Sequence, residues 1–77
     1  MKDQFDLELD TRGLMCPLPL LRLKKVLVGM DPGQRVLVQA TDPAAVLDFG
    51  VFLDQTGHRL IERWEESGVF YFLVCKG

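Results

Sequence analysis

The sequence contains few residues that ligate metals or form disulfides, and this scarcity excludes several kinds of site. Among its 77 residues are two cysteines, Cys16 and Cys75, and one histidine, His58. This set is too small for an ordinary zinc site. The cysteines lie far apart, so the chain has no Cys-x-x-Cys motif of a redox dithiol. A disulfide between them would need two distant segments to meet, and we expect reduced thiols in a cytoplasmic protein.

The sequence also lacks long apolar runs, phosphate-binding loops and dinucleotide fingerprints. The apolar runs are short and interrupted by charges, which predicts no membrane span. The acidic, alternating segment Met1–Asp10 predicts no secretory signal. A net charge of −2, without a stripe of aromatic and basic residues, argues against direct nucleic-acid binding. We therefore expect a cytoplasmic monomer without a membrane, nucleic-acid or metal partner and with no resident cofactor.

Length and composition predict one small folded domain covering residues 1–77. The chain is 48% hydrophobic and 26% charged, which is typical of a globular protein. A chain of this size buries only about 60% of its unfolded surface, so its core is thin. The strict apolar and polar alternation over residues 5–10 predicts a half-buried first strand.

Periodicity and turn signals divide the rest of the chain into five segments. They are a first helix over 17–30, a second strand over 35–41, a second helix over 42–55, a third strand over 58–65 and a fourth strand over 69–76. Right-handed crossovers that run the same way put both helices on one face of the sheet. We predict an α+β two-layer sandwich, βαβαββ, with a four-stranded mixed sheet. The fourth strand is apolar on both faces, which predicts a central position or partial cover by a partner.

The run Cys16-Pro17-Leu18-Pro19 is the most informative feature that is present. Proline is tolerated at the first helical position because its missing N–H would be unpaired there. Pro17 at that position makes Cys16 the capping residue, with its sulfur at the positive end of the helix dipole. We therefore expect a lowered thiol pKa and a reactive thiolate. The alternative is a small apolar residue packed at a helix start.

Charge and helical spacing point to a surface beside Cys16. Residues 11–30 contain four basic residues and no acidic one: Arg12, Arg22, Lys24 and Lys25. Positive neighbours also lower a thiol pKa. Leu20, Leu23, Leu27 and Met30 share one helix face and form the predicted core stripe, with Val26 at its edge. Leu18 and Leu21 fall on the other side with the basic residues, which indicates either a docking surface or an ordinary solvated face.

Hydrolytic cysteine chemistry does not fit this sequence. A nucleophilic cysteine in a hydrolase needs an adjacent base and a group that orients the base. His58 lies at the start of the third predicted strand, and no pattern places it beside Cys16. The remaining chemistry is a single sulfur that accepts a group and passes it on.

The segment Leu9–Pro19, followed by Arg22-Leu23-Lys24-Lys25, resembles the opening of the TusA/SirA-like sulfur-carrier proteins. The hallmark of that family is Cys-Pro-x-Pro after a first strand, so Gly13, Pro17 and Pro19 belong to the motif that leads into the helix. The likeness continues through Thr41-Asp42-Pro43-Ala44, the Gly57-His58 turn and a terminal hairpin ending in Lys76. The resemblance therefore covers nearly the whole chain.

This resemblance implies that Cys16 carries sulfur as a persulfide, in a sulfurtransferase-like carrier rather than a stand-alone enzyme. A cysteine desulfurase or a rhodanese would be the donor. An acceptor protein in tRNA thiolation, molybdenum cofactor assembly or sulfur oxidation would take the sulfur. Arg12, Leu18, Leu21, Arg22, Lys24 and Lys25 would dock partners or stabilise the thiolate. Leu18 takes the motif's middle place, which is often acidic or variable in the family.

Two other functions remain open at the level of sequence. One is a regulatory or interaction module whose Cys16 senses redox state. The other, an RNA-binding domain, is indicated only by the implied likeness to the C-terminal domain of translation initiation factor three. Cys75 lies outside the family motif, and we expect it to be structural.

Overall fold

Four strands and two helices make up the chain, in the order β1, α1, β2, α2, β3, β4. A computed structural model of the protein describes residues 4–77, so the first three residues of the Met1–Asp10 segment lie outside it. The elements are β1 (Leu7–Thr11), α1 (Leu18–Val28), β2 (Arg35–Ala40), α2 (Ala44–Asp54), β3 (Arg59–Glu66) and β4 (Val69–Cys75). The predicted βαβαββ order is thus confirmed.

The four strands form one mixed sheet in the order β1-β2-β4-β3. Strand β1 runs parallel to β2, with Leu9 opposite Val38. Strand β4 pairs antiparallel with both β2 and β3. The apolar β4 is therefore central, which explains why its sequence is apolar on both faces.

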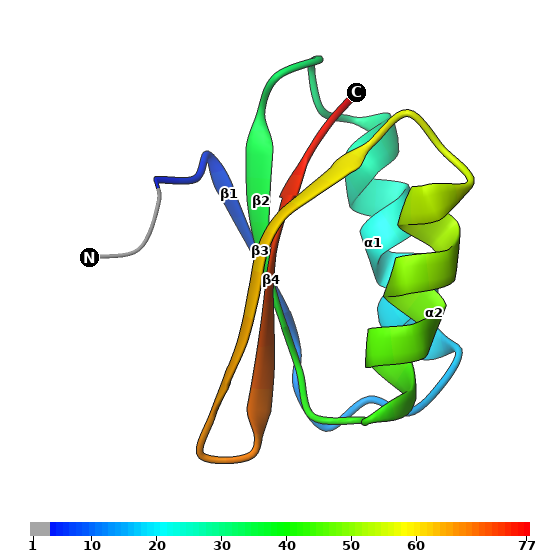
Figure 1. Cartoon of the computed structure of the whole chain (residues 1–77), viewed down its shortest axis with the longest axis vertical. Helices are drawn as coiled ribbons and strands as arrows, with labels where there is room; N and C mark the ends of the chain where they lie inside the picture. The colour runs from blue at the N-terminus through cyan, green and yellow to red at the C-terminus, as the bar shows by residue number, and fades with distance from the viewer. Residues whose placement is uncertain (1–3) are drawn as a thin grey trace.

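Both helices cover the same face of the sheet, as predicted, and both begin at the same end of the molecule (Figure 1). The core lies between these two layers. Phe49 of α2 meets Phe72 of β4 edge to face, with ring centroids 4.6 Å apart. Leu23 and Leu27 of α1, both buried, complete the helix side of this core. Of the predicted stripe, Met30 is also buried, while Leu20 and Val26 pack against the core only partly buried.

The opposite face of the sheet has no helix over it, yet its centre is well covered by its own side chains. Leu73 is buried, and Leu37 and Cys75 are each only 9% exposed. Trp64 of β3 stacks on Tyr71 of β4 with centroids 5.1 Å apart and ring planes nearly parallel. Aromatic cross-strand pairs of this kind stabilise sheets. No helix within residues 4–77 is long and apolar enough to cross a membrane.

The helix boundaries differ from the predicted ones by one or two residues. Pro17 and Pro43 are the N-cap residues rather than the first helical residues. Before α1 the chain makes a turn in which the Leu18 N–H donates to the Met15 carbonyl at 2.8 Å. This turn moves the helix start one residue later. The proline at the second helical position is Pro19, which is buried.

Candidate functional site

Two loops meet where parallel strands β1 and β2 end and the helices begin. The Gly13 N–H in the first loop donates to Thr41 Oγ1 in the second at 2.8 Å. At the end of β1, just before the first loop, Thr11 Oγ1 donates a hydrogen bond to the Gln39 carbonyl at 2.6 Å. Gly13 has a φ of +81°, a backbone conformation that glycine adopts without steric cost. The fold therefore joins segments about 28 residues apart in the sequence at the place where the cysteine motif lies.

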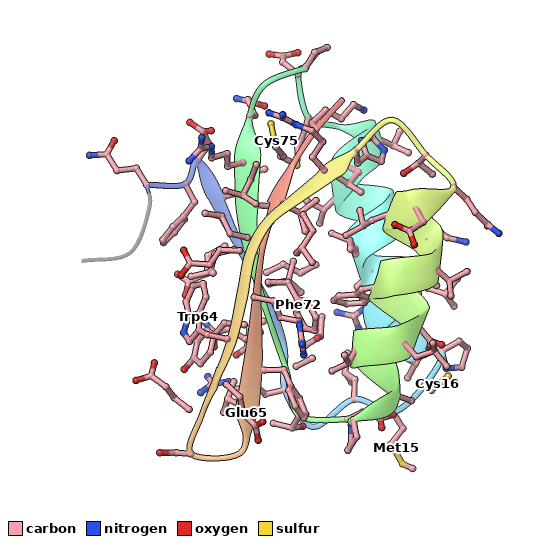
Figure 2. The ribbon with its side chains drawn as sticks, in the orientation of Figure 1. Met15, Cys16, Trp64, Glu65, Phe72 and Cys75 are labelled. Atoms are coloured by element: carbon pink, nitrogen blue, oxygen red, sulfur yellow. The ribbon has the colours of Figure 1, made fainter. Side chains whose placement is uncertain are left out.

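Cys16 is exposed at this junction, one residue before the N-cap of α1. The prediction that Cys16 caps the helix is therefore wrong, because the Met15–Leu18 turn makes Pro17 the capping residue. Figure 2 shows Cys16 and Met15 at the end of the molecule where the helices start, with Cys75 toward the opposite end. Cys75 is buried, and both cysteines are free thiols. The alternative that Cys16 is a packed, buried residue is thereby excluded.

Asp42 connects the cysteine loop to the start of α2. Its Oδ2 accepts the backbone N–H of Cys16 at 2.7 Å, and its Oδ1 accepts the N–H of Ala44 at 3.0 Å. These two hydrogen bonds stabilise the ionised carboxylate and lower the pKa of Asp42. Asp42 thus fixes the backbone of Cys16 relative to the second helix.

The Cys16 thiol donates a hydrogen bond to Asp48, one turn into α2. The distance from Cys16 Sγ to Asp48 Oδ2 is 3.0 Å. This hydrogen bond, partial desolvation and the negative charges of Asp48 and Asp42 raise the pKa of Cys16. The sequence-based expectation of a lowered thiol pKa is therefore wrong. The fold brings acidic residues of the second loop and helix to the thiol, and these outweigh the local excess of basic residues.

Two of the four basic residues predicted to stabilise the thiolate, Arg12 and Lys24, contact other groups instead. Arg12 pairs with Asp10 through its Nε and Nη2, at 3.0 and 2.9 Å. This pair lowers the pKa of Asp10 to about 2. The ammonium of Lys24 lies 5.3 Å from the centre of the Phe52 ring, within range of a cation–π contact. Arg22 and Lys25 are exposed on α1. No basic group contributes to the raised pKa of Cys16.

Exposed apolar side chains occur beside the cysteine and on both helices, and they are more numerous than the sequence predicted. Leu18 and Leu21 of α1 are 45% and 52% exposed, and Met15 beside the cysteine is 73% exposed. Helix α2 adds Leu47 and Val51, which are 70% and 47% exposed. We call these five residues the apolar rim. Sequence reasoning missed the α2 members, although their spacing of four residues already indicates a common helix face.

A shallow groove of about 260 Å³ separates the two helices on this side. It is lined by Leu20, Lys24, Leu47, Asp48, Val51, Phe52 and Gln55. Asp48 therefore contributes both to the groove wall and to the thiol hydrogen bond. The groove thus contains two residues of the apolar rim, Leu47 and Val51, together with the carboxylate that contacts the thiol.

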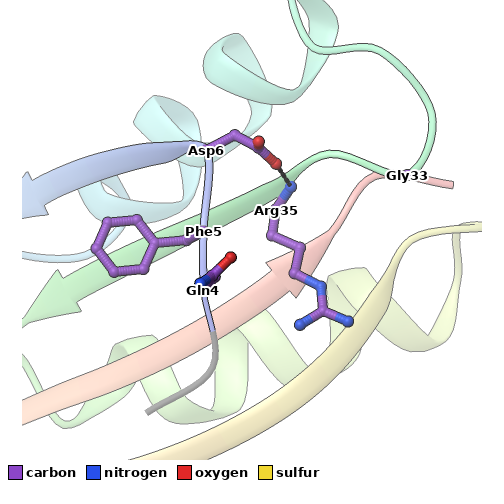
Figure 3. Close-up of a pocket in the computed structure, with 5 residues that line it drawn as sticks. All are labelled: Gln4, Phe5, Asp6, Gly33 and Arg35. Carbon is purple, nitrogen blue, oxygen red and sulfur yellow. Dashed lines mark hydrogen bonds between the residues drawn. The ribbon is translucent and has the colours of Figure 1, made fainter. Parts of the chain in front are cut away.

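Two other features lie away from Cys16. The contacts of His58 are a tilted ring contact with Phe52, at 6.0 Å, and a hydrogen bond from the Gly77 N–H. A second hollow of about 280 Å³, at the start of β2, is lined by Gln4, Phe5, Asp6, Gly33 and Arg35. There the Arg35 N–H donates to Asp6 Oδ2 at 2.9 Å (Figure 3), which ties the segment before β1 to β2. Within residues 4–77, no three His, Cys, Asp or Glu residues are grouped to hold a metal ion.

Comparison with solved structures defines the class of fold. The crystal structure of a SirA-like protein from Desulfitobacterium hafniense superposes with a TM-score of 0.82, covering 94% of this chain and 99% of that one. The two sequences are 23% identical, so the likeness concerns the fold. The chain therefore has the SirA-like two-layer fold.

Sequence comparisons define the family within that fold. The family model described as sulfurtransferase TusA matches residues 7–76. The sulfur carrier protein TusA of Allochromatium vinosum is 56% identical over 72 residues, covering 94% of this chain and 95% of the relative. The protein of the same name from Pseudomonas aeruginosa is 36% identical over 76 residues, covering 99% and 96%. This chain belongs to the TusA family of sulfur carrier proteins.

Proposed function

We propose that Cys16 accepts sulfur from a donor protein as a persulfide and passes it to an acceptor protein in the cytoplasm. The observation that carries this proposal is the exposed thiol at the junction of the two helix starts. The chemistry is thiol–persulfide exchange, which needs an accessible sulfur and no general base of the hydrolase type. The histidine of the chain has its contacts elsewhere, which fits this chemistry.

The donor in this proposal is a cysteine desulfurase or a rhodanese. The acceptor belongs to tRNA thiolation, molybdenum cofactor assembly or sulfur oxidation. Membership of the TusA family and relatives named sulfur carrier proteins support donor and acceptor partners in general. The shallow surface around Cys16 supports protein partners, because a groove of about 260 Å³ encloses little of a ligand while an apolar rim offers contact area.

Sulfur relay is tested with cysteine labelled at sulfur-35, a cysteine desulfurase and a candidate acceptor from each pathway. We expect label on this protein first, then on one acceptor, and no label on the Cys16→Ser variant. Labelling of an acceptor at the same rate without this protein would contradict a carrier role. Oxidation of Cys16 by peroxide without any labelling would favour the redox-sensing alternative instead.

The docking part of the proposal is tested with Leu21→Glu. A charge within the apolar rim should reduce transfer to or from a partner by tenfold or more, because a carboxylate left unpaired in the interface opposes association. Val28→Glu is the matched control, since Val28 lies on the same helix and is 81% exposed. Both variants should react equally with iodoacetamide at Cys16. Equal loss of transfer in the two variants would contradict docking through the apolar rim.

A further inference from the structure

The hydrogen bond between Cys16 and Asp48 exists only while the sulfur carries its proton. The donor is Sγ, and the acceptor Asp48 Oδ2 lies 3.0 Å away. A thiolate in the same place would face a carboxylate at contact distance, and two like charges repel. The contact therefore favours the protonated thiol, which is less nucleophilic than the thiolate.

The position of Asp48 opposes ionisation of the thiol. A thiolate 3.0 Å from a carboxylate oxygen would be repelled, whereas a protonated thiol donates a hydrogen bond to it. The hydrogen bond to Asp48 and the charges of Asp48 and Asp42 accordingly raise the pKa of Cys16. The carboxylate therefore restrains the thiol more than it activates it.

The charged groups that face the thiol come from the second half of the site. They are Asp48 of α2 and Asp42 of the loop after β2, and both act to keep the proton on sulfur. The basic residues nearest in sequence bind elsewhere, because Arg12 pairs with Asp10 and Lys24 lies over Phe52. Lys24 lines the same groove as Asp48, but its ammonium lies over the Phe52 ring, and within residues 4–77 no cation of the chain is paired with Asp48. The carboxylate is therefore free to pair with a cation that a partner brings. Asp48 is open to such a cation because it lines the groove between the helices.

We propose that Asp48 restrains Cys16 as a protonated thiol in the free carrier, and that a donor or acceptor protein releases it by placing a lysine or arginine against Asp48. This inference rests on the proposed carrier function and adds the chemistry of the partner. It makes Asp48 a determinant of specificity between protein partners and small reactive molecules. Small reagents such as peroxides, alkylating agents and low-molecular-weight disulfides do not place a cation against Asp48. They therefore react with Cys16 while it is still held as the less reactive thiol.

The transfer step balances without an added oxidant or reductant. Cys16 loses its proton, and Sγ attacks the terminal sulfur of the donor persulfide. A new bond forms between Sγ and that sulfur, while the sulfur–sulfur bond of the donor breaks. The donor leaves as a thiolate, takes up a proton and becomes a thiol. The terminal sulfur moves with its oxidation state unchanged, and Asp48 then lies beside a sulfur that has no proton to donate.

The restraint is tested by the pH dependence of Cys16 alkylation with iodoacetamide, in a Cys75→Ser background so that one thiol reacts. Asp48→Asn should shift the midpoint of the rate profile to lower pH, because it removes the charge next to Sγ. A fall of one unit in thiol pKa gives about ten times more thiolate but a weaker nucleophile, so the rate at pH 7 should rise roughly threefold per unit.

Two further variants separate charge from structure. Asp48→Glu keeps the negative charge, and its pH profile of Cys16 alkylation should lie closer to that of the wild-type protein. Asp54→Asn makes the same chemical change on the same helix, at an exposed position without contact to Cys16, and should leave the profile unchanged. Identical profiles for Asp48→Asn and the wild-type protein would overturn the proposed restraint. A profile that also shifts in Asp54→Asn would overturn it, since the effect would not be specific to Asp48.

Release by a partner cation is tested by comparing two rates in each variant, loading by a cysteine desulfurase and alkylation by iodoacetamide. In Asp48→Asn the ratio of loading to alkylation should fall at least threefold, because the partner has no carboxylate left to neutralise. An unchanged ratio would overturn the partner part of the proposal. Failure of the wild-type protein to load from any donor would contradict the carrier function itself, while the alkylation profile still decides the role of Asp48.

Discussion

At the scale of single residues, the site consists of one thiol and two carboxylates with different roles. Asp42 accepts hydrogen bonds from the backbone of Cys16 and of Ala44 at the start of α2, whereas Asp48 accepts one from the Cys16 thiol. The sequence predicted Cys16 from its motif, but it did not predict these two acids as parts of the site. They lie 26 and 32 residues further along the chain, and no local spacing connects them to Cys16. The two acids reach Cys16 only because the two loops meet in the folded protein.

The pKa of Asp42 gives a prediction at this scale. Because the ionised carboxylate accepts two N–H groups in the folded protein, its pKa is lowered. Its contribution to stability is therefore present above the pKa of an unfolded aspartate, near 3.9, and is lost as the pH falls through the lower folded value. The amide proton resonances of Cys16 and Ala44 should shift in an NMR pH titration with a midpoint below 3.9. A midpoint at or above 3.9 would contradict the hydrogen bonds assigned to Asp42.

At the scale of elements, helix α1 has one buried face and one exposed face. The prediction of these faces was confirmed for Leu23 and Leu27, which are buried, and for Leu18 and Leu21, which are exposed. The helical period of 3.6 residues explains this success, since it decides which side chains share a face. The helix starts were predicted less well, because the Met15–Leu18 turn, which contains Pro17, lies in a loop that is hydrogen-bonded to the second loop.

Replacing leucine by alanine on each face should give very different losses of stability. Leu23 is fully buried, and Leu23→Ala should lower the free energy of unfolding by about 2–5 kcal/mol through lost burial and a cavity. Leu21 is 52% exposed, and Leu21→Ala should change it by no more than about 0.5 kcal/mol. Urea denaturation followed by circular dichroism measures both. Equal losses in the two variants would contradict the assignment of the faces.

At the scale of the whole molecule, the topology creates the site. Parallel strands β1 and β2 end at the same edge of the sheet, so the loops that follow them lie next to each other. The sequence predicted the element order and the placement of both helices on one face. It did not predict the strand order β1-β2-β4-β3, because pairing between distant strands depends on the whole core. The apolar character of β4 on both faces was the only local indication of its central position.

The same topology separates the two thiols of the protein. Cys16 lies exposed at the end where the helices start, and Cys75 is buried at the end of β4. A carrier with one accessible sulfur takes up one sulfur atom by exchange, whereas a buried thiol is protected from a protein donor. The number and position of added sulfur atoms therefore show whether Cys16 alone takes up sulfur.

Intact mass spectrometry after incubation with a cysteine desulfurase and cysteine is the most direct test of the central claim. One added sulfur atom, removed by a reducing agent, is expected in the wild-type protein and in Cys75→Ser, and none in Cys16→Ser. Absence of the adduct with several desulfurases and rhodaneses, or its persistence in Cys16→Ser, would contradict the assignment of Cys16 as the sulfur carrier.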